Sequence, residues 1–434
     1  MLKPINEIIK NKVFLKYIKN TSWLFVSKVF SFLSVIFINS YLASYLGPEK
    51  YGLLIYSSSI VIMFLPLAMI GLNDIVVKEL VKIKDKVAIN NILGTAFFLK
   101  LLFGCLSLIL LAVLVLTFQN DDQTRYLIAI FSFYLLLQSL EVLDFFFQSE
   151  VKSRFVVYGR IFALVVTGII KILLIIYEVE LFFFAFAMVL ELLITNIIVV
   201  WFFYKNKFSF FFWKFSTPLA KTLLKKSWPL FLSGLMFVIY VKIDQIMVKE
   251  ILGSHSAGIY AVAITLSEAW YFIPNIIVSS LFPAILLAKK GNQNVYQKKI
   301  TMLYSFLLWI AIALSILFTF FGDFIISYLY GADYEESSLV FKIYIWSNVF
   351  FFINVLSSKW LVTEGYYLHS FYRNIIGAIL NVLLNFFLIS KYGLKGAAIS
   401  TLISYSVVAF FYDLFFKELR MNLNLKLKSI LCIN

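Results

Sequence analysis

Long uninterrupted apolar segments are the feature of this sequence that most limits its possible folds. They recur along the whole chain of 434 residues, in which 62% of the residues are hydrophobic and 14% are charged. A soluble domain is about half apolar and about one quarter charged, and a globule of this size could not bury the excess. Lipid is therefore the expected solvent, and the predicted fold class is an all-α polytopic membrane protein.

We predict about twelve membrane-spanning helices, because each crossing of the hydrocarbon core takes about 20 apolar residues. The expected ranges are 21–46, 52–72, 92–117, 126–148, 155–177, 181–204, 227–251, 257–287, 301–321, 338–361, 370–390 and 395–417. Runs of this length exclude a transmembrane barrel, whose strands alternate over about ten residues.

Lysine and arginine are distributed unevenly over the connections between these spans. The segment 1–20 holds five and the linker 205–226 holds six, whereas all the connections of the opposite side hold only Lys50, Arg125 and Lys391. Positive residues accumulate in cytoplasmic connections. An even number of spans with both termini in the cytoplasm is therefore predicted, with residues 418–434 as a cytoplasmic tail.

The segment 1–20 also has an amphipathic pattern, since apolar residues recur every four positions among its lysines. A helix of this kind can lie on the anionic inner leaflet. A topology signal with no other role is the alternative interpretation.

An internal repeat divides the chain into two lobes, an N-lobe over 21–204 and a C-lobe over 227–417. Leu46-Gly47 and Leu252-Gly253 each begin the pattern Leu-Gly-x4-Gly, and a proline follows in the next span, Pro66 in one copy and Pro274 in the other. Because the offset covers six helices, the two copies have the same orientation and are related by a parallel pseudo-two-fold axis. The prolines either take part in gating or kink their helices for packing.

A set of short motifs in constant order carries a family resemblance over about residues 20–417. The motifs are Asp144-Phe145-Phe146-Phe147-Gln148, Asp244-Gln245-Ile246-Met247, Ala257-Gly258-Ile259-Tyr260, Leu329-Tyr330-Gly331, Lys391-Tyr392-Gly393 and Gly396-Ala397-Ala398-Ile399-Ser400. Together they resemble the polysaccharide transporter family of O-antigen and lipid-linked oligosaccharide flippases, within the multidrug/oligosaccharidyl-lipid/polysaccharide exporter superfamily. The sequence departs from the family pattern at Ser149, where a glycine is expected, and at Lys28, where an arginine is expected.

The resemblance implies two six-helix lobes around a central cavity in a bacterial inner-membrane protein. It further implies that the substrate is a polyprenyl-diphosphate-linked oligosaccharide of O-antigen or capsule type, moved from the cytoplasmic to the outer leaflet by alternating access. Membrane lipid is then a partner, and a polymerase and other polysaccharide assembly proteins are possible ones; no nucleic acid is expected.

Charged residues inside the spans are the candidate substrate-binding groups, because such a residue costs at least about 2.5–3.5 kcal/mol in the bilayer centre unless it faces a cavity or a partner. We expect a cationic cavity for the diphosphate, lined by Lys28, Arg160, Lys171 and Lys242. Internal pairing is the alternative, above all of Arg160 with Asp144. Lys100 is expected to extend toward the interface, as lysines near span ends do.

Oxygen-bearing side chains of the C-lobe form a second candidate site. Asp244, Asn381, Asn385 and Thr401 could hold Na⁺ or be protonated in turn if their helices meet. Hydrogen bonding between helices is the alternative role. No other cofactor is expected: neither histidine has a metal-ligand spacing, and ATP- and dinucleotide-binding motifs are lacking.

Two other functions compete with the flippase. An ion-coupled multidrug antiporter of the same superfamily is one, although basic residues outnumber an evident acidic trap for a cationic drug. A polysaccharide polymerase is the other, but its external loop would carry arginines, and the loop 322–337 contains neither lysine nor arginine. The sequence therefore favours a transporter over an enzyme.

Overall fold

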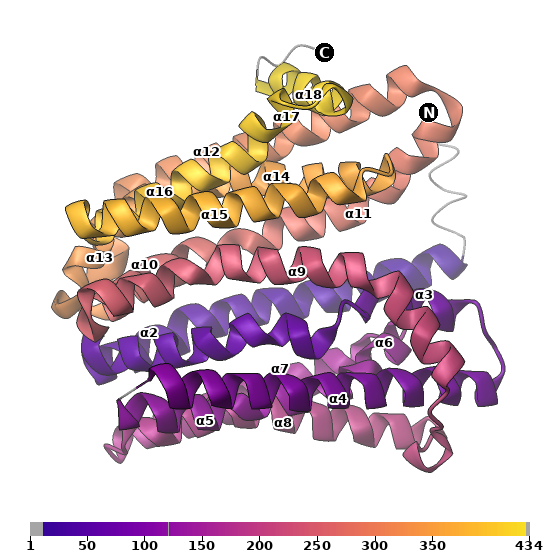
Figure 1. Cartoon of the computed structure of the whole chain (residues 1–434), viewed down its shortest axis with the longest axis horizontal. Coiled ribbons are helices and arrows are strands. Elements are labelled where there is room, and N and C mark those ends of the chain that lie inside the picture. The colour runs from indigo at the N-terminus through magenta and orange to yellow at the C-terminus, as the bar shows by residue number, and fades with distance from the viewer. Residues whose placement is uncertain (1–11, 120, 431–434) are drawn as a thin grey trace. The chain divides into compact units, whose positions relative to one another are not determined.

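All regular elements are helical in the computed structural model, which describes residues 12–119 and 121–430 (Figure 1). The first half comprises α2 (Lys12–Met69), α3 (Asn73–Val81), α4 (Lys86–Phe118), α5 (Asp122–Leu137), η1 (Gln138–Glu141), α6 (Val142–Ser149), α7 (Arg154–Ile176), α8 (Leu181–Lys205) and η2 (Phe210–Phe212). The second half comprises α9 (Thr217–Leu252), α10 (Ser254–Glu268), η3 (Ala269–Tyr271), α11 (Phe272–Gly291), α12 (Gln293–Tyr330), η4 (Ala332–Tyr334), α13 (Glu335–Tyr344), α14 (Ser347–Thr363), α15 (Tyr367–Tyr392), α16 (Leu394–Ser406), η5 (Val407–Phe411), α17 (Tyr412–Leu414), η6 (Lys417–Leu419) and α18 (Arg420–Ile430). The predicted fold class is confirmed.

Ten helices of the described residues are long and apolar enough to cross a membrane, and the pair Ala332–Tyr344 and Ser347–Thr363, bent by 47°, adds an eleventh. One of the ten, Phe25–Val81, has 57 residues and contains a break in helical geometry at Gly47. A single crossing needs about 20 residues, so this stretch supplies two spans. With it divided, the spans correspond to the twelve expected from the sequence.

The chain forms two compact units. Unit 1 consists of residues up to Ile38 together with Ser57–Leu235, and unit 2 consists of Asn39–Tyr56 together with the residues from Met236 onward. The division by contacts thus differs from the division by sequence, because the segment around Gly47 is packed within unit 2. Most of the segment 1–20 lies outside the described residues, so its amphipathic character stays a prediction.

Hydrogen bonds fix the segment Asn39–Tyr56 in unit 2. The Ser44 hydroxyl donates to the Tyr330 carbonyl at 3.0 Å, and the Tyr334 hydroxyl donates to the Ala43 carbonyl at 2.8 Å. The Tyr56 hydroxyl donates to a Glu250 carboxylate oxygen at 2.5 Å. These bonds join the end of the first span and the start of the second to residues that follow 194 to 291 positions later in the chain.

The repeated glycines make a reciprocal contact within unit 2. Gly47 (φ 71°) and Gly253 (φ 88°) both adopt left-handed backbone at the start of the pattern, which non-glycine residues rarely adopt. A Cβ on Gly52 would lie 1.9 Å from the Ser254 carbonyl oxygen, and a Cβ on Gly258 would lie 1.9 Å from the Pro48 carbonyl oxygen. Pro48 and Ser254 occupy the same position of the repeat. At Gly52 and Gly258 the two copies therefore approach each other symmetrically, with backbone against backbone.

Several spans depart from α geometry in their interiors. The turn Gln138–Glu141 is a 3-10 segment, Ala269–Tyr271 is another, and Val407–Phe411 is a π segment. Pro274 accounts for the second break, because it lacks the N–H that would bond to the carbonyl of Trp270. Pro66 is buried one turn before the end of α2 and accompanies no such break.

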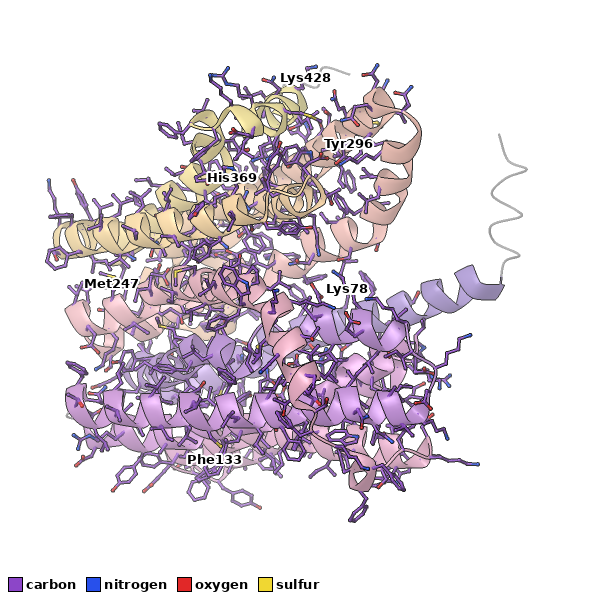
Figure 2. All side chains as sticks on the ribbon, turned by 45° about the vertical axis from the view of Figure 1, so that its right-hand side comes forward. Lys78, Phe133, Met247, Tyr296, His369 and Lys428 are labelled. Atoms are coloured by element: carbon purple, nitrogen blue, oxygen red, sulfur yellow. The ribbon has the colours of Figure 1, made fainter. Side chains whose placement is uncertain are left out.

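The residues predicted as a tail include α18, which packs on α12 at one end of unit 2. Figure 2 shows Lys428 of α18 and Tyr296 near the start of α12 at this end. The Ser305 hydroxyl donates to the Ser429 carbonyl at 3.0 Å. Residues 420–430 are therefore an integral part of the unit.

Candidate functional site

Three charged side chains of unit 1 form the first candidate site: Lys28 on α2, Asp144 on α6 and Arg160 on α7. Arg160 and Asp144 are the charged groups that act electrostatically on Lys28. Lys28 is exposed and Arg160 half-buried, and in the described part of the chain neither has a carboxylate within 4.0 Å. The expected alternative, an ion pair of Arg160 with Asp144, is not formed at that distance. Two cations and one carboxylate give the cluster a net positive charge.

Other intramembrane lysines have carboxylate partners. Lys171 on α7 lies 3.9 Å from Glu191 on α8, and Lys242 on α9 lies 3.2 Å from Glu268 at the end of α10. Lys171 is buried, whereas Lys242 is half-buried. Of the four predicted cavity residues, Lys171 and Lys242 are thus paired, whereas Lys28 and Arg160 have no such partner within the described ranges.

The expectation that Lys100 extends toward the interface is wrong. Its side chain is fully buried, and its ammonium lies 2.6 Å from Glu141 and 4.9 Å from the centre of the Phe145 ring. The 3-10 turn at Gln138–Glu141 places Glu141 toward α4. A buried cation is retained in apolar surroundings when it is paired in this way.

The predicted coupling residues are all buried in unit 2, where they form two hydrogen-bonded groups that we call together the polar cluster. Asp244 on α9 is 1% exposed, and its carboxylate accepts hydrogen bonds from the Tyr260 hydroxyl at 2.7 Å and the Thr401 hydroxyl at 3.2 Å. On α15, the Asn385 amide donates to the Asn381 side-chain oxygen at 2.9 Å. Tyr260 on α10 was not predicted as a member of this cluster.

Close packing brings α15 alongside α9 at the level of this cluster. A Cβ on Gly377 would lie 3.2 Å from the Tyr240 ring and 2.5 Å from Val408. Asp244 is one turn beyond Tyr240, and Asn381 is one turn beyond Gly377. The predicted topology gives α9 and α15, the seventh and eleventh spans, the same direction. One turn along each helix would then bring Asp244 and Asn381 to a similar depth.

The asparagine pair has unused hydrogen-bonding capacity. The Asn385 side-chain oxygen and the Asn381 side-chain nitrogen are buried and have no hydrogen-bond partner among the residues that the structure describes. A buried polar group without a partner costs free energy. Hard cations prefer carboxylate, amide and hydroxyl oxygens as ligands, so the types of these residues fit Na⁺. A proton on Asp244 would likewise neutralise the carboxylate.

A further cluster of buried charges lies near the start of α15 and the end of α16. It was not predicted from the sequence. Lys426 of α18 contacts Asp413 at 2.7 Å with both side chains fully buried, and it donates to the Ala409 carbonyl in the π segment. Arg373 is fully buried and donates to the Ser357 hydroxyl at 2.8 Å. Arg373 and Asp413 lie near the ends of their spans, where a charge gives no signal of burial.

His369 contacts the Tyr412 hydroxyl at 3.0 Å. Within the described ranges, no three or more His, Cys, Asp or Glu side chains lie close enough together to hold a metal ion.

The architecture of two units of broken membrane-spanning helices is shared with solved transporters. The lipid II flippase MurJ in an inward closed conformation aligns with a TM-score of 0.70 at 17% identity, covering 95% of this chain and 91% of MurJ. An inward-facing multidrug resistance transporter of the MATE family aligns with a TM-score of 0.66 at 15% identity, covering 93% and 96%. The chain therefore shares its fold with these two solved membrane proteins.

Sequence comparison gives the family. Residues 17–289 match the family Polysacc_synt, described as polysaccharide biosynthesis protein, and residues 229–387 match the family MatE. The first match covers more than half of the chain, and the protein belongs to that family. The capsular polysaccharide biosynthesis protein CapF of Staphylococcus aureus is 23% identical over 192 residues, which are 44% of this chain and 48% of CapF. The chain thus spans about half the length of this curated relative.

Proposed function

We propose that this protein is a flippase that moves a polyprenyl-diphosphate-linked oligosaccharide, of O-antigen or capsule type, from the cytoplasmic to the outer leaflet by alternating access. The observation that carries the proposal is the pair Lys28 and Arg160, two cations within the spans of unit 1 for which residues 12–119 and 121–430 supply no carboxylate at ion-pair distance. Membership of a polysaccharide biosynthesis family supports the substrate class. The location is the bacterial inner membrane, with both termini in the cytoplasm.

The chemistry of the head group requires such cations. A diphosphate that enters a low-dielectric passage loses hydration and must gain compensating charge. Lys28 supplies a point charge, whereas Arg160 supplies a planar guanidinium able to bind two phosphate oxygens at once. We assign these two residues the primary contact with the diphosphate. Lys171 and Lys242 take a secondary part, because each already has a carboxylate partner.

The polar cluster of unit 2 supplies the coupling in this proposal. Binding of Na⁺ or a proton at Asp244, Asn381, Asn385 and Thr401 would neutralise the buried carboxylate and occupy the unpartnered amide oxygen of Asn385. Either ion would favour one arrangement of α9, α15 and α16 over another. Pro66 and Pro274 are proposed as points of flexibility, Pro274 with the added support of its neighbouring 3-10 turn.

The test is transport of a fluorescent polyprenyl-diphosphate-linked saccharide by purified protein in proteoliposomes. Lys28→Gln and Arg160→Gln are each expected to abolish transport at normal protein levels, while Lys28→Arg retains it. Lys50→Gln, at an exposed position of α2 just after the break at Gly47, is the matched control and is expected to remain active. Full activity of both the Lys28→Gln and the Arg160→Gln variants would refute the assignment of the site.

An ion-coupled multidrug antiporter is the second candidate, and the match of residues 229–387 to the MatE family favours it. Such a protein would bind cationic drugs at acidic groups such as Glu268 and Glu191, both of which are occupied by lysines. Efflux of a cationic dye by the same proteoliposomes, together with no movement of the lipid-linked saccharide, would decide for the antiporter. A polymerase has no further support from the site.

A further inference from the structure

The linker between α8 and α9 carries an aromatic cluster that the proposed function does not use. Residues 207–215 read Lys-Phe-Ser-Phe-Phe-Phe-Trp-Lys-Phe, and all of them belong to unit 1. A connection at the end of a span would ordinarily be polar and mobile. This connection instead has six aromatic residues within nine positions.

Three of these aromatic side chains fix the linker to unit 1. The rings of Phe208, Phe210 and Trp213 lie 5.5, 5.6 and 5.9 Å from the ring of Phe203, measured between centroids. Phe203 itself is fully buried on α8. Edge-to-face and offset arrangements at these separations are favourable aromatic contacts. The linker is therefore held in one conformation.

Backbone contacts with α4 hold the far end of the linker. A Cβ on Gly94 would lie 2.8 Å from both the backbone nitrogen and the carbonyl oxygen of Lys214. The amide of Ser216 donates to the Thr95 hydroxyl at 3.1 Å. Gly94 is thus required for the close approach, and this part of the linker cannot move away without losing it.

The other three aromatic side chains are held outward. Phe211 is 91% exposed, Phe212 65% and Phe215 50%. In water, exposing three neighbouring phenyl rings costs free energy, and a conformation that enforces it would be disfavoured. The same arrangement is favourable where α8 leaves the membrane, since aromatic rings gather at the level of the lipid head groups.

Lysines flank the outward rings. Lys205, Lys207 and Lys214 are exposed, and none of them has a carboxylate partner within 4.0 Å in the residues that the structure describes. Residues 205–216 contain no acidic side chain. A surface of unpaired lysines around apolar rings is complementary to an anionic lipid leaflet, with the rings below the head groups and the ammonium groups at phosphate level.

We propose that residues 205–215 form a membrane anchor that inserts Phe211, Phe212 and Phe215 into the leaflet at which α8 ends and binds its anionic head groups through Lys205, Lys207 and Lys214. The anchor holds the connection between the two lobes at a fixed depth. It does not depend on the flippase function, because it requires only the membrane assignment.

The test places an environment-sensitive fluorophore at Phe211. In a Cys105→Ser/Cys432→Ser background, Phe211→Cys is labelled with NBD, and the protein is reconstituted in nanodiscs of phosphatidylcholine alone or mixed with phosphatidylglycerol. Blue-shifted emission and quenching by nitroxide-labelled lipids are expected, with stronger quenching when phosphatidylglycerol is present. Emission at the wavelength of a water-exposed probe, without quenching, would overturn the proposal.

Two positions calibrate the signal. A probe on Phe133→Cys gives the signal expected in lipid, because Figure 2 shows Phe133 at the periphery of unit 1 and its side chain is 55% exposed. A probe on Lys84→Cys gives the signal expected in water, because Lys84 is an exposed residue of the connection between α3 and α4.

Neutralising the lysines tests the electrostatic part. In the triple variant Lys205→Gln/Lys207→Gln/Lys214→Gln, the quenching is expected no longer to depend on phosphatidylglycerol. Each lysine removed should lower the partitioning of the segment into the anionic membrane by about fivefold. An unchanged dependence in this variant would overturn the role of the lysines. A probe at residue 211 that is exposed in nanodiscs but shielded in native membranes would instead indicate a protein partner and overturn the lipid proposal.

Discussion

Substitution of alanine for Gly52 provides the sharpest test of the repeat architecture. The new Cβ would lie 1.9 Å from the Ser254 carbonyl oxygen, whereas real contacts of this kind are at least about 3 Å apart. The neighbour is backbone, so no side chain can rotate away. The two copies of the repeat would have to separate by about 1 Å, and overpacking of this kind costs about 1–3 kcal/mol and occasionally more.

Symmetry makes the prediction specific. Gly258→Ala introduces the same collision with the Pro48 carbonyl oxygen, also at 1.9 Å, and should destabilise the protein by a similar amount. One separation of the copies relieves both collisions. The double variant Gly52→Ala/Gly258→Ala should therefore cost clearly less than the sum of the two single variants, as expected for residues that share one contact.

The measurement is denaturant- or heat-induced unfolding in detergent micelles, followed by tryptophan fluorescence. Gly234→Ala is the control, because a Cβ there meets nothing within 4 Å, and alanine favours the helix by about 0.5–1 kcal/mol. The reasoning fails if Gly52→Ala is as stable as Gly234→Ala. It also fails if the two single effects add fully.

Three further predictions concern buried charges. Lys100→Met should destabilise the protein by about 3–5 kcal/mol because it leaves Glu141 without its partner, and Lys100→Met/Glu141→Leu should recover much of that loss in the same unfolding assay. Asp244→Asn should abolish any dependence of transport on a Na⁺ or pH gradient while the protein still folds, as measured by flux under imposed gradients. Burial lowers the pKa of Lys426 from 10.5 to about 8 despite the opposing effect of Asp413. Between pH 8 and 10.5 the folded state therefore binds fewer protons than the unfolded state, so stability rises with pH in that window; the melting temperature of the wild type should rise relative to that of Lys426→Met over this range.

The sequence was sufficient for the helical architecture because hydrophobic length is a local property. The breaks at Gly47 and Gly253 could also be expected, since each glycine begins a recurring pattern. The reciprocal contact that the pattern makes could not, because it depends on the approach of segments 206 residues apart. The π segment Val407–Phe411 likewise has no local signal.

Charged residues show most clearly where sequence reasoning ends. Asp244 and Thr401 were expected to be near each other and lie in hydrogen-bonding contact. Lys100 was expected to reach the interface but is buried against Glu141. Depth along a span can be estimated from the sequence, whereas the direction of a side chain around the helix and the identity of its partner are set by tertiary packing.

Pairing is the property by which we propose to separate structural from functional charges in these helices. A lysine bonded to a carboxylate, as Lys100 is, forms a neutral unit whose desolvation is offset inside the protein. In the described part of the chain, Asp144 is the carboxylate that acts on Lys28 and Arg160, and these three groups together carry an excess positive charge among apolar segments. That excess costs free energy in every state in which no anion is present. An anionic ligand within the membrane removes this cost, and for that reason the unpaired cations, rather than the more deeply buried ones, are the residues to which we assign the diphosphate.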